Sequence, residues 1–235
     1  MILDKFTLNS VIVQTVYADA FVLWDRAGEI ARRMSEIWPG LKVAEGQPNQ
    51  QTLGAPGIQI QTGFRASTFT VRGPKALDQS RIRQFTESYA LLRDRLEIPE
   101  LTRVSARSLY VRKFESLKEA NAAVFDLGLV KWPNERVFDQ PMEADRNGSE
   151  LLYRFEDKAS FTLLRLKAEE LKLETELDPE FFDEPINRSQ FRMIIDFDRG
   201  NLGAINAQKF RMDDWLKGYS HVLRRDIDKV LRPAK

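Results

Sequence analysis

Two aspartates near the end of the chain have the spacing that metal chemistry requires. Asp196 and Asp198 stand two residues apart within residues 191–198, an apolar segment that is typical of a β-strand. Side chains two apart on a strand project from the same face. Paired carboxylates can hold Mg²⁺ together with phosphate oxygens, which would suit a metal-dependent phosphoesterase. The alternative is that both lie on the solvent side of the strand, and it is favoured because the sequence offers no third ligand.

A second candidate is a group of basic residues on predicted strands. Three of them share one parity of the strand predicted over residues 101–114, and two lie on a hairpin that we expect beside it. On one face they would form a basic stripe able to bind nucleic-acid phosphates or an acidic partner. The alternative, which we favour, is pairing with glutamates across strands. The basic residues are Arg65, Arg72, Arg103, Arg107 and Lys113, and the glutamates are Glu170, Glu174 and Glu176.

A third candidate is aromatic and lies outside the periodic segments. Trp132 falls in an expected insertion near residues 128–149, and Phe181 and Phe182 fall in another near 178–190. Loops carry function more often than their scaffolds, and exposed aromatic residues are typical anchors of protein interfaces. These three side chains are therefore candidate interface residues. The pattern does not decide between this role and packing against the chain's own core.

No catalytic constellation accompanies these candidates. The chain has no cysteine, so thiolate nucleophiles, disulfides and thiolate-bound metals are excluded. Its one histidine, His221, has neither a serine-plus-acid context nor a G-x-S-x-G motif, and we expect it to be an exposed helix residue. The 36 basic and 35 acidic side chains almost cancel, so no overall field favours nucleic acid or an anionic membrane. We predict no catalytic residue and no cofactor, and we favour a non-enzyme.

The elements that position these residues follow from periodicity. In the first hundred residues we expect a strand over 10–17, a helix capped by Asp19, a short strand over 41–45, a polar loop over 46–56 and a hairpin over 58–72. A long amphipathic helix follows, capped by Asp78 and ended before Pro99.

The second part of the chain shows the same order of elements. The predicted segments are a strand over 101–114, a helix over 116–127, strands over 151–155, 161–168, 171–177 and 191–198, and a final helix over 212–231. We therefore predict an α+β fold made of two tandem strand–helix–antiparallel strands–helix units, residues 1–100 and 101–235. Each unit has one apolar sheet face and two striped helices, which predicts a two-layer sandwich. Joining the units edge to edge would give one continuous antiparallel sheet.

The arrangement resembles that of a sporadically distributed and little-characterised family of prokaryotic proteins. The similarity is greatest over residues 102–110, where Arg103 and Arg107 match an arginine–three residues–arginine strand that follows a long helix. A second similarity is the stretch 194–198, which precedes a terminal helix. The resemblance implies no catalytic role. The scattered occurrence of the family would suit a component of a defence or mobile-element system.

These observations lead to a functional expectation. We expect a non-catalytic binding or assembly subunit that holds a protein partner or a second copy of itself through loop aromatics and sheet edges. The alternatives are a nucleic-acid-binding module that uses Arg103 and Arg107 and, more remotely, the phosphoesterase. No apolar run approaches the ~20 residues that a membrane-spanning helix needs, and no signal peptide is evident. We therefore expect a cytoplasmic protein without membrane contact.

Overall fold

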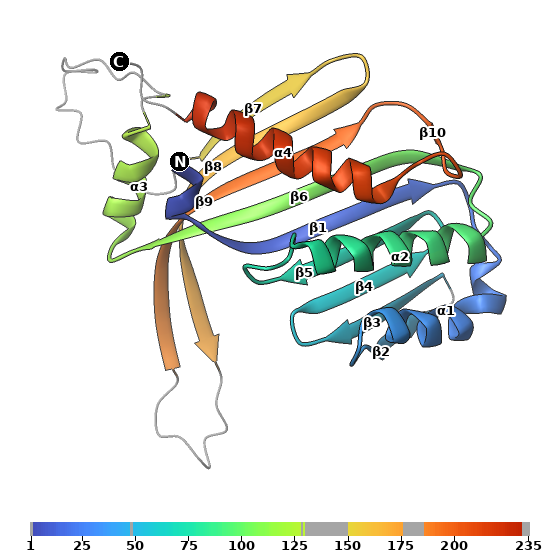
Figure 1. Cartoon of the computed structure of the whole chain (residues 1–235). Helices are drawn as coiled ribbons and strands as arrows, with labels where there is room; N and C mark the ends of the chain where they lie inside the picture. The colour runs from blue at the N-terminus through green and yellow to red at the C-terminus, as the bar shows by residue number, and fades with distance from the viewer. Residues whose placement is uncertain (1, 48, 128, 130–149, 176–185, 232–235) are drawn as a thin grey trace, which may run out of the picture.

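The computed structural model describes residues 2–47, 49–127, 129, 150–175 and 186–231. Its strands form one ten-stranded antiparallel sheet in the order β2-β3-β4-β5-β1-β6-β9-β8-β7, and β10 pairs with β6 outside this path (Figure 1). The strands are β1 Thr7–Tyr17, β2 Lys42–Gln47, β3 Gln50–Ala55, β4 Ile58–Gly63, β5 Ala66–Arg72, β6 Glu100–Phe114, β7 Glu150–Glu156, β8 Ser160–Thr175, β9 Ile186–Asn201 and β10 Ile205–Asn206.

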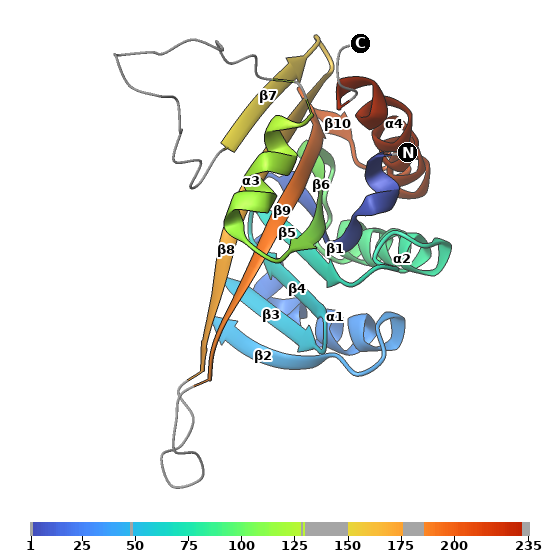
Figure 2. The same cartoon turned by 90° about the vertical axis from the view of Figure 1, so that its left-hand side faces the viewer.

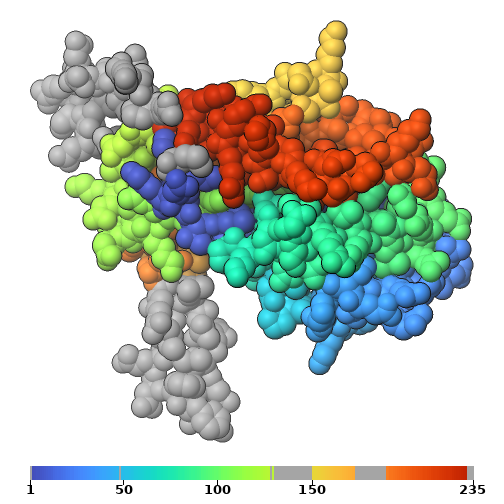
Figure 3. Space-filling view, in the orientation of Figure 1, coloured from blue at the N-terminus to red at the C-terminus, as the bar shows by residue number. Residues whose placement is uncertain are grey.

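The α-helices make the second layer. They are α1 Leu23–Ile37, α2 Gln79–Arg95, α3 Leu117–Phe125 and α4 Met212–Val230, and a short 3-10 turn, η1 Ile2–Lys5, precedes β1. Figure 2 shows α1, α2 and α4 on one face of the sheet. No helix of the described residues lies on the opposite face, which we call the helix-free face. In the space-filling view these three helices lie side by side (Figure 3). The α+β class and the large antiparallel sheet agree with the sequence prediction. No helix in the described part of the chain is long and apolar enough to cross a membrane.

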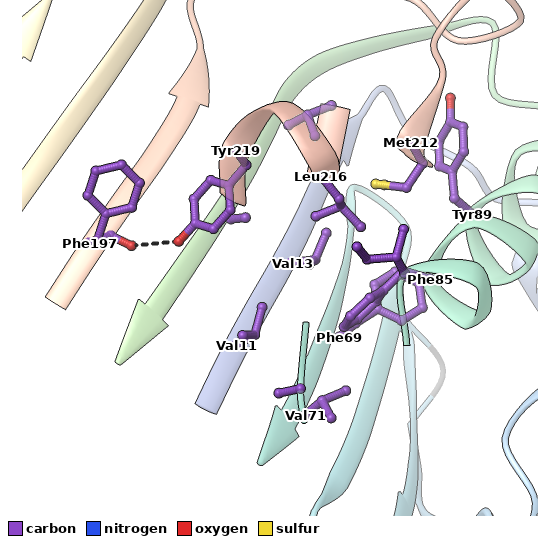
Figure 4. Packing of buried hydrophobic residues seen from close by; sticks show 14 of the residues in the cluster. Val11, Val13, Phe69, Val71, Phe85, Tyr89, Phe197, Met212, Leu216 and Tyr219 are labelled. Carbon is purple, nitrogen blue, oxygen red and sulfur yellow. Dashed lines mark hydrogen bonds between the residues drawn. The ribbon is translucent and has the colours of Figure 1, made fainter. Parts of the chain in front are cut away.

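Alternation along the strands accounts for this layering. In β6 the buried Val104, Ala106 and Ser108 alternate with Arg103 and Arg107, so one side of the strand packs under the helices and the other carries charge. The same alternation in β1 and β5 sends valines and phenylalanine toward α2 and α4 (Figure 4). The apolar residues of both halves of the chain form one continuous core cluster.

The pairing of β1 with β6 lies at the middle of the sheet. It extends from Thr7–Val111 to Tyr17–Leu101, with two local shifts of register. On its outer sides β1 pairs with β5 and β6 pairs with β9. A strand from the start of the chain and one from its middle therefore meet in the central ladder.

The first half agrees with the prediction at its helices but not throughout. Asp78 caps α2 by accepting a hydrogen bond from the Arg81 N–H, as expected. Asp19 is not a cap, because α1 begins at Leu23 and no side chain caps it. The predicted polar loop over 46–56 is also wrong, since β3 lies within it. Pairing with β2 and β4 on its two sides satisfies the backbone of β3, whose polar sequence alone does not favour a strand.

In the second half, the strands predicted over 161–168 and 171–177 are one strand, β8. Strand β9 begins at Ile186, five residues before its predicted start and inside the insertion expected near 178–190. At the expected break, the Glu169 carboxylate pairs with Arg192 and Glu170 accepts a hydrogen bond from Ser189, so cross-strand contacts continue the ladder. Beyond the pair Glu170–Phe191 the two strands leave the sheet as a two-stranded ribbon (Figure 2).

A buried hydrogen bond joins α4 to the sheet beneath it. The Tyr219 hydroxyl hydrogen-bonds to Ser108 Oγ on β6 at 2.7 Å and to the Phe197 carbonyl oxygen on β9 at 3.0 Å (Figure 4). Burial raises the pKa of Tyr219 far above its ordinary value, so the group stays neutral. The contact fixes the register of α4 over the two strands.

Removing this hydroxyl tests the helix–sheet contact. Tyr219→Phe keeps the ring but leaves two buried polar groups short of a partner, so we expect the free energy of unfolding to fall by about 1–2 kcal/mol. His221→Ala, at an exposed position of the same helix, should change it by less than about 0.5 kcal/mol. Urea denaturation measures both variants. Equal effects would show that the Tyr219 hydroxyl does not anchor α4.

Candidate functional site

The aspartates and arginines singled out in the sequence lie together on the helix-free face. Strand β6 pairs directly with β9, which places Arg107 opposite Asp198 and Leu109 opposite Asp196. Side chains at directly opposite positions share a face. The two candidate sites therefore occupy one area of the sheet.

Asp196 is the centre of an ion-pair cluster. Arg107 donates to both of its oxygens, with Nε–Oδ1 2.7 Å and Nη2–Oδ2 2.5 Å, while Arg165 Nη1 lies 3.4 Å from Oδ2. The Asp196 side chain is only 7% exposed. Arg165 Nε is also 2.8 Å from Glu150 Oε1, so the network extends from β6 across β9 and β8 to β7. Such two-pronged arginine–carboxylate contacts are among the stronger polar interactions in proteins.

Asp198 has a looser environment than Asp196. Its carboxylate is 3.9 Å from Arg103, whose guanidinium stacks 5.0 Å over the ring of Phe161. Burial raises the pKa of Asp198, and the charges of Arg103 and Arg107 oppose that rise. The two aspartates therefore differ, since one is firmly paired and the other is weakly paired and harder to ionise.

This arrangement favours a structural ion-pair cluster over a metal site. Both Asp196 oxygens already accept hydrogen bonds from arginine. Within the described ranges no group of three or more His, Asp or Glu side chains could hold a metal ion. The expected pairing of the basic strand across the sheet is present for Arg103 and Arg107, but the partners are Asp198 and Asp196 rather than glutamates.

The other predicted basic residues do not extend this cluster into a stripe. Arg65 pairs with Asp19 beyond the end of β1, with Nε–Oδ1 2.5 Å. Arg72 lies on β5, which β1 separates from β6. Lys113 pairs in register with Arg192. The expected adjacency of the hairpin 58–72 to β6 is therefore wrong.

Three predicted residues and two glutamates cannot be placed. Trp132, Phe181, Phe182 and Glu176 lie outside the described residues, as does the side chain of Glu174. Glu170 hydrogen-bonds to Ser189 rather than to an arginine.

An apolar surface that the sequence reasoning missed lies at the β2 edge of the sheet. Among the described residues five large hydrophobic side chains are exposed, and Phe21, Trp24 and Val43 are three of them, at 56%, 61% and 63%. Phe64 packs edge-on against both aromatic residues, with ring centroids 5.1 and 5.2 Å away. We call Phe21, Trp24 and Val43 the edge patch. Exposed apolar groups gathered in this way mark interaction sites more often than isolated ones do.

A hollow of about 310 Å³ opens beside the edge patch, between α1 and the strands β2 and β3. Helix α1 lines it with Leu23 and Trp24 at its first turn. The next lining residues of the helix, Ala27, Gly28 and Ala31, are small and leave part of the space unfilled. Gln51 on β3 also lines it and is 7% exposed, yet its Nε2 has no hydrogen-bond partner in the described part of the chain. A buried donor without an acceptor costs free energy, and an oxygen brought by a binding partner would remove that cost.

Gly46 on the edge strand adds no side chain beside the buried Gln51. Gly46 on β2 pairs directly with Gln51, and a Cβ at Gly46 would meet no atom within 4 Å. The Cβ position of Gly46 is therefore open, while Val43 and Gln47 of the same strand line the hollow.

One sequence signal pointed to this surface. Trp24 lies off the apolar stripe of α1, which includes Leu23, Ile30 and Met34, so an exposed position was foreseeable. No sequence pattern singled out Gln51, because it lies within residues 46–56, which were predicted to form a polar loop.

Comparisons with known proteins give no family for this chain. No protein-family model matches it, and no curated protein sequence matches it. Among solved structures, a match is the crystal structure of the ZhuI aromatase/cyclase from Streptomyces sp. R1128, at 11% identity and covering 96% of this chain and 92% of that one. The TM-score is 0.20, so the likeness carries no argument about fold or function.

Two substitutions on β9 separate the roles of the aspartates. Asp196→Asn removes the charge that neutralises Arg107 and Arg165, and we expect a loss of about 2 kcal/mol in the free energy of unfolding. Asp198→Asn, two residues away on the same face, should cost less than about 1 kcal/mol, because its ion pair is long and Arg103 is exposed. Urea denaturation at neutral pH compares them. A larger loss from Asp198→Asn would contradict the assignment.

The raised pKa of Asp198 predicts a pH dependence. Because burial raises this pKa above its ordinary 3.8, the folded protein binds the proton more tightly than the unfolded chain. Stability from this group is therefore greatest at low pH and falls as the pH rises through the window between the unfolded and the folded pKa. The stability of the parent relative to Asp198→Asn should decline from about pH 4 upward. A difference that grows with pH would refute this sign.

Proposed function

We propose that this protein is a non-catalytic binding or assembly subunit that holds another protein at the β2 edge of its sheet. The observation that carries the proposal is the edge patch beside a hollow that contains an unpaired amide. Apolar surface supplies affinity, and a buried polar group that needs a specific partner supplies selectivity.

The free edge of β2 supports the same proposal. All six residues of β2 are exposed, and among the described strands only β3 pairs with it. Lys42 and Glu45 on this strand form no ion pair with another described residue. An edge strand with unpaired backbone groups is a recognised docking element for extended segments of other proteins.

The geometry supports the alternative functions less well. For nucleic acid, Arg103 and Arg107 would first have to give up Asp198 and Asp196, which already offset their charge. For a phosphoesterase, Asp196 would have to exchange two arginines for a metal ion. A protein partner at the β2 edge disturbs neither arrangement.

We also propose that the chain consists of two units of like design, residues 1–100 and 101–235. In support, each stretch has the order strand, helix, antiparallel strands and helix. Their leading strands, β1 and β6, are neighbours at the centre of the sheet, so the two units would be joined edge to edge. On this view the β2 edge belongs to the first unit.

Substitution in the edge patch tests the binding function. Trp24→Ser with Val43→Ser should weaken association by about 2 kcal/mol or more, about thirtyfold in Kd, because both side chains would be buried by the partner. The melting temperature should change by only a few degrees, since both are already exposed. Leu152→Ser, at a 54% exposed position on β7, is the matched control.

The measurement is quantitative mass spectrometry of proteins captured from native lysate by the three forms, with light scattering to detect self-association. The proposal predicts a protein that the parent and the Leu152→Ser control retain and the double variant loses. Equal capture by all three forms, or unfolding of the double variant, would contradict it.

A further inference from the structure

A second hollow lies on the helix-covered side, at the opposite edge of the sheet. Helix α4 crosses the sheet so that β7 and the adjoining end of β8 emerge beyond it (Figure 1). Between α4 and these strands is a groove of about 360 Å³, which we call the α4–β7 groove. Its size is within the range of small-molecule sites in proteins.

The walls of the α4–β7 groove are mostly apolar. Leu164 and Phe197 form part of the sheet side and are 2% and 6% exposed. Val222 and Ile227 contribute from α4. Phe155 on β7 also lines the groove and is 47% exposed, which leaves an aromatic ring at its open side. Such a lining favours a ligand with an apolar body.

Two cations line this space, Lys229 and Arg199. Lys229 pairs with Asp226, whereas Arg199 has no acidic ion-pair partner among the described residues. Its Nη1 donates to Thr162 Oγ1 at 2.8 Å and its Nη2 to Ser160 Oγ at 3.1 Å, and both acceptors are neutral hydroxyls. No described carboxylate forms an ion pair with it. A guanidinium has five N–H donors, so most remain for a ligand.

The carboxylates near Arg199 are already used by other groups. Asp157 has a lowered pKa mainly because the backbone N–H groups of Ala159 and Ser160 donate to it, and Arg199 adds a smaller Coulombic effect. Asp226 lines the groove, but Arg225 and Lys229 both donate to its Oδ1, each at 2.9 Å. Arg199 therefore has no ion-pair partner among the described residues, and Asp157 offsets its charge only weakly.

From this combination we infer that the α4–β7 groove binds a small amphipathic carboxylate. The apolar body of the ligand lies between α4 and β7–β9, and its carboxylate accepts hydrogen bonds from Arg199. A guanidinium matches a carboxylate with two parallel hydrogen bonds, and the apolar surroundings strengthen that contact. A neutral apolar molecule would leave Arg199 without a counter-charge, and a small inorganic anion would leave the apolar walls exposed. This site is separate from the proposed protein interface, which lies at the other edge of the sheet.

Octanoate is the probe. Octan-1-ol is the control ligand that lacks the carboxylate, and acetate is the control ligand that lacks the apolar body. Titration calorimetry and NMR on the full chain should show octanoate binding about tenfold or more tightly than either control ligand. Equal affinities for octanoate and octan-1-ol would overturn the proposal, because Arg199 would then play no part. No octanoate binding at millimolar concentration would overturn it as well.

Two variants assign the binding to named groups. Arg199→Gln keeps a donor for the Thr162 hydroxyl but removes the charge, and should weaken octanoate about tenfold while leaving octan-1-ol unchanged. Arg154→Gln, on β7 and paired with Glu156, is the control and should bind like the parent. An octanoate affinity that is unchanged in Arg199→Gln would contradict the inference.

A third variant tests the apolar body of the site. Val222→Trp should fill the groove from a partly buried position and abolish binding of both octanoate and octan-1-ol. Val230→Phe on the same helix serves the same purpose if the tryptophan variant does not fold. Unchanged octanoate affinity in a folded variant of either kind would place the ligand elsewhere and refute the proposal.

Discussion

The central pairing of β1 with β6 is the constraint on which the rest of the structure depends. It joins residues about a hundred positions apart in the sequence, and every other strand attaches outward from one of these two. It places β9 beside β6, which brings Asp196 to Arg107. It also sends the β2 and β7 edges to opposite ends of one sheet, so that the two hollows lie far apart in the fold. Long-range pairing of this kind carries a large loop-closure cost, which the shared apolar core must offset.

The charged cluster on the helix-free face shows how strand pairing changes the meaning of residue patterns that were read one strand at a time. Asp196 with Asp198 suggested a metal site, while Arg103 with Arg107 suggested an anion site. In the folded chain each pair is the other's counter-charge. The opposite charges of this cluster offset one another, so the cluster needs no bound ligand to balance its charge. No described helix covers this face, so Asp196 is shielded from solvent by the side chains of Arg107 and Arg165.

The sequence predicted those elements whose signals are local. Strand β6 has a clean alternation, α2 has a capping aspartate and a stripe, and both were found nearly to the residue. Strand β3 was missed because its polar residues become a strand only through neighbours on both sides. Asp19 was misread as a cap because its actual partner, Arg65, lies 46 residues away. Of the edge patch, only Trp24 had a local signal, its position off the apolar stripe of α1. The patch as a whole could not be predicted, because exposure depends on which other elements leave a side chain uncovered.

Protein binding at the β2 edge is the central claim, and hydrogen–deuterium exchange of the chain with its captured partner tests it most directly. The account predicts slower exchange over residues 42–47 and 50–51, where the edge strand and Gln51 lie, and over the start of α1 near Trp24. Exchange on the helix-free face around Asp196 should stay the same in the free and bound chain. Protection confined to the helix-free face, with β2 unaffected, would contradict the account.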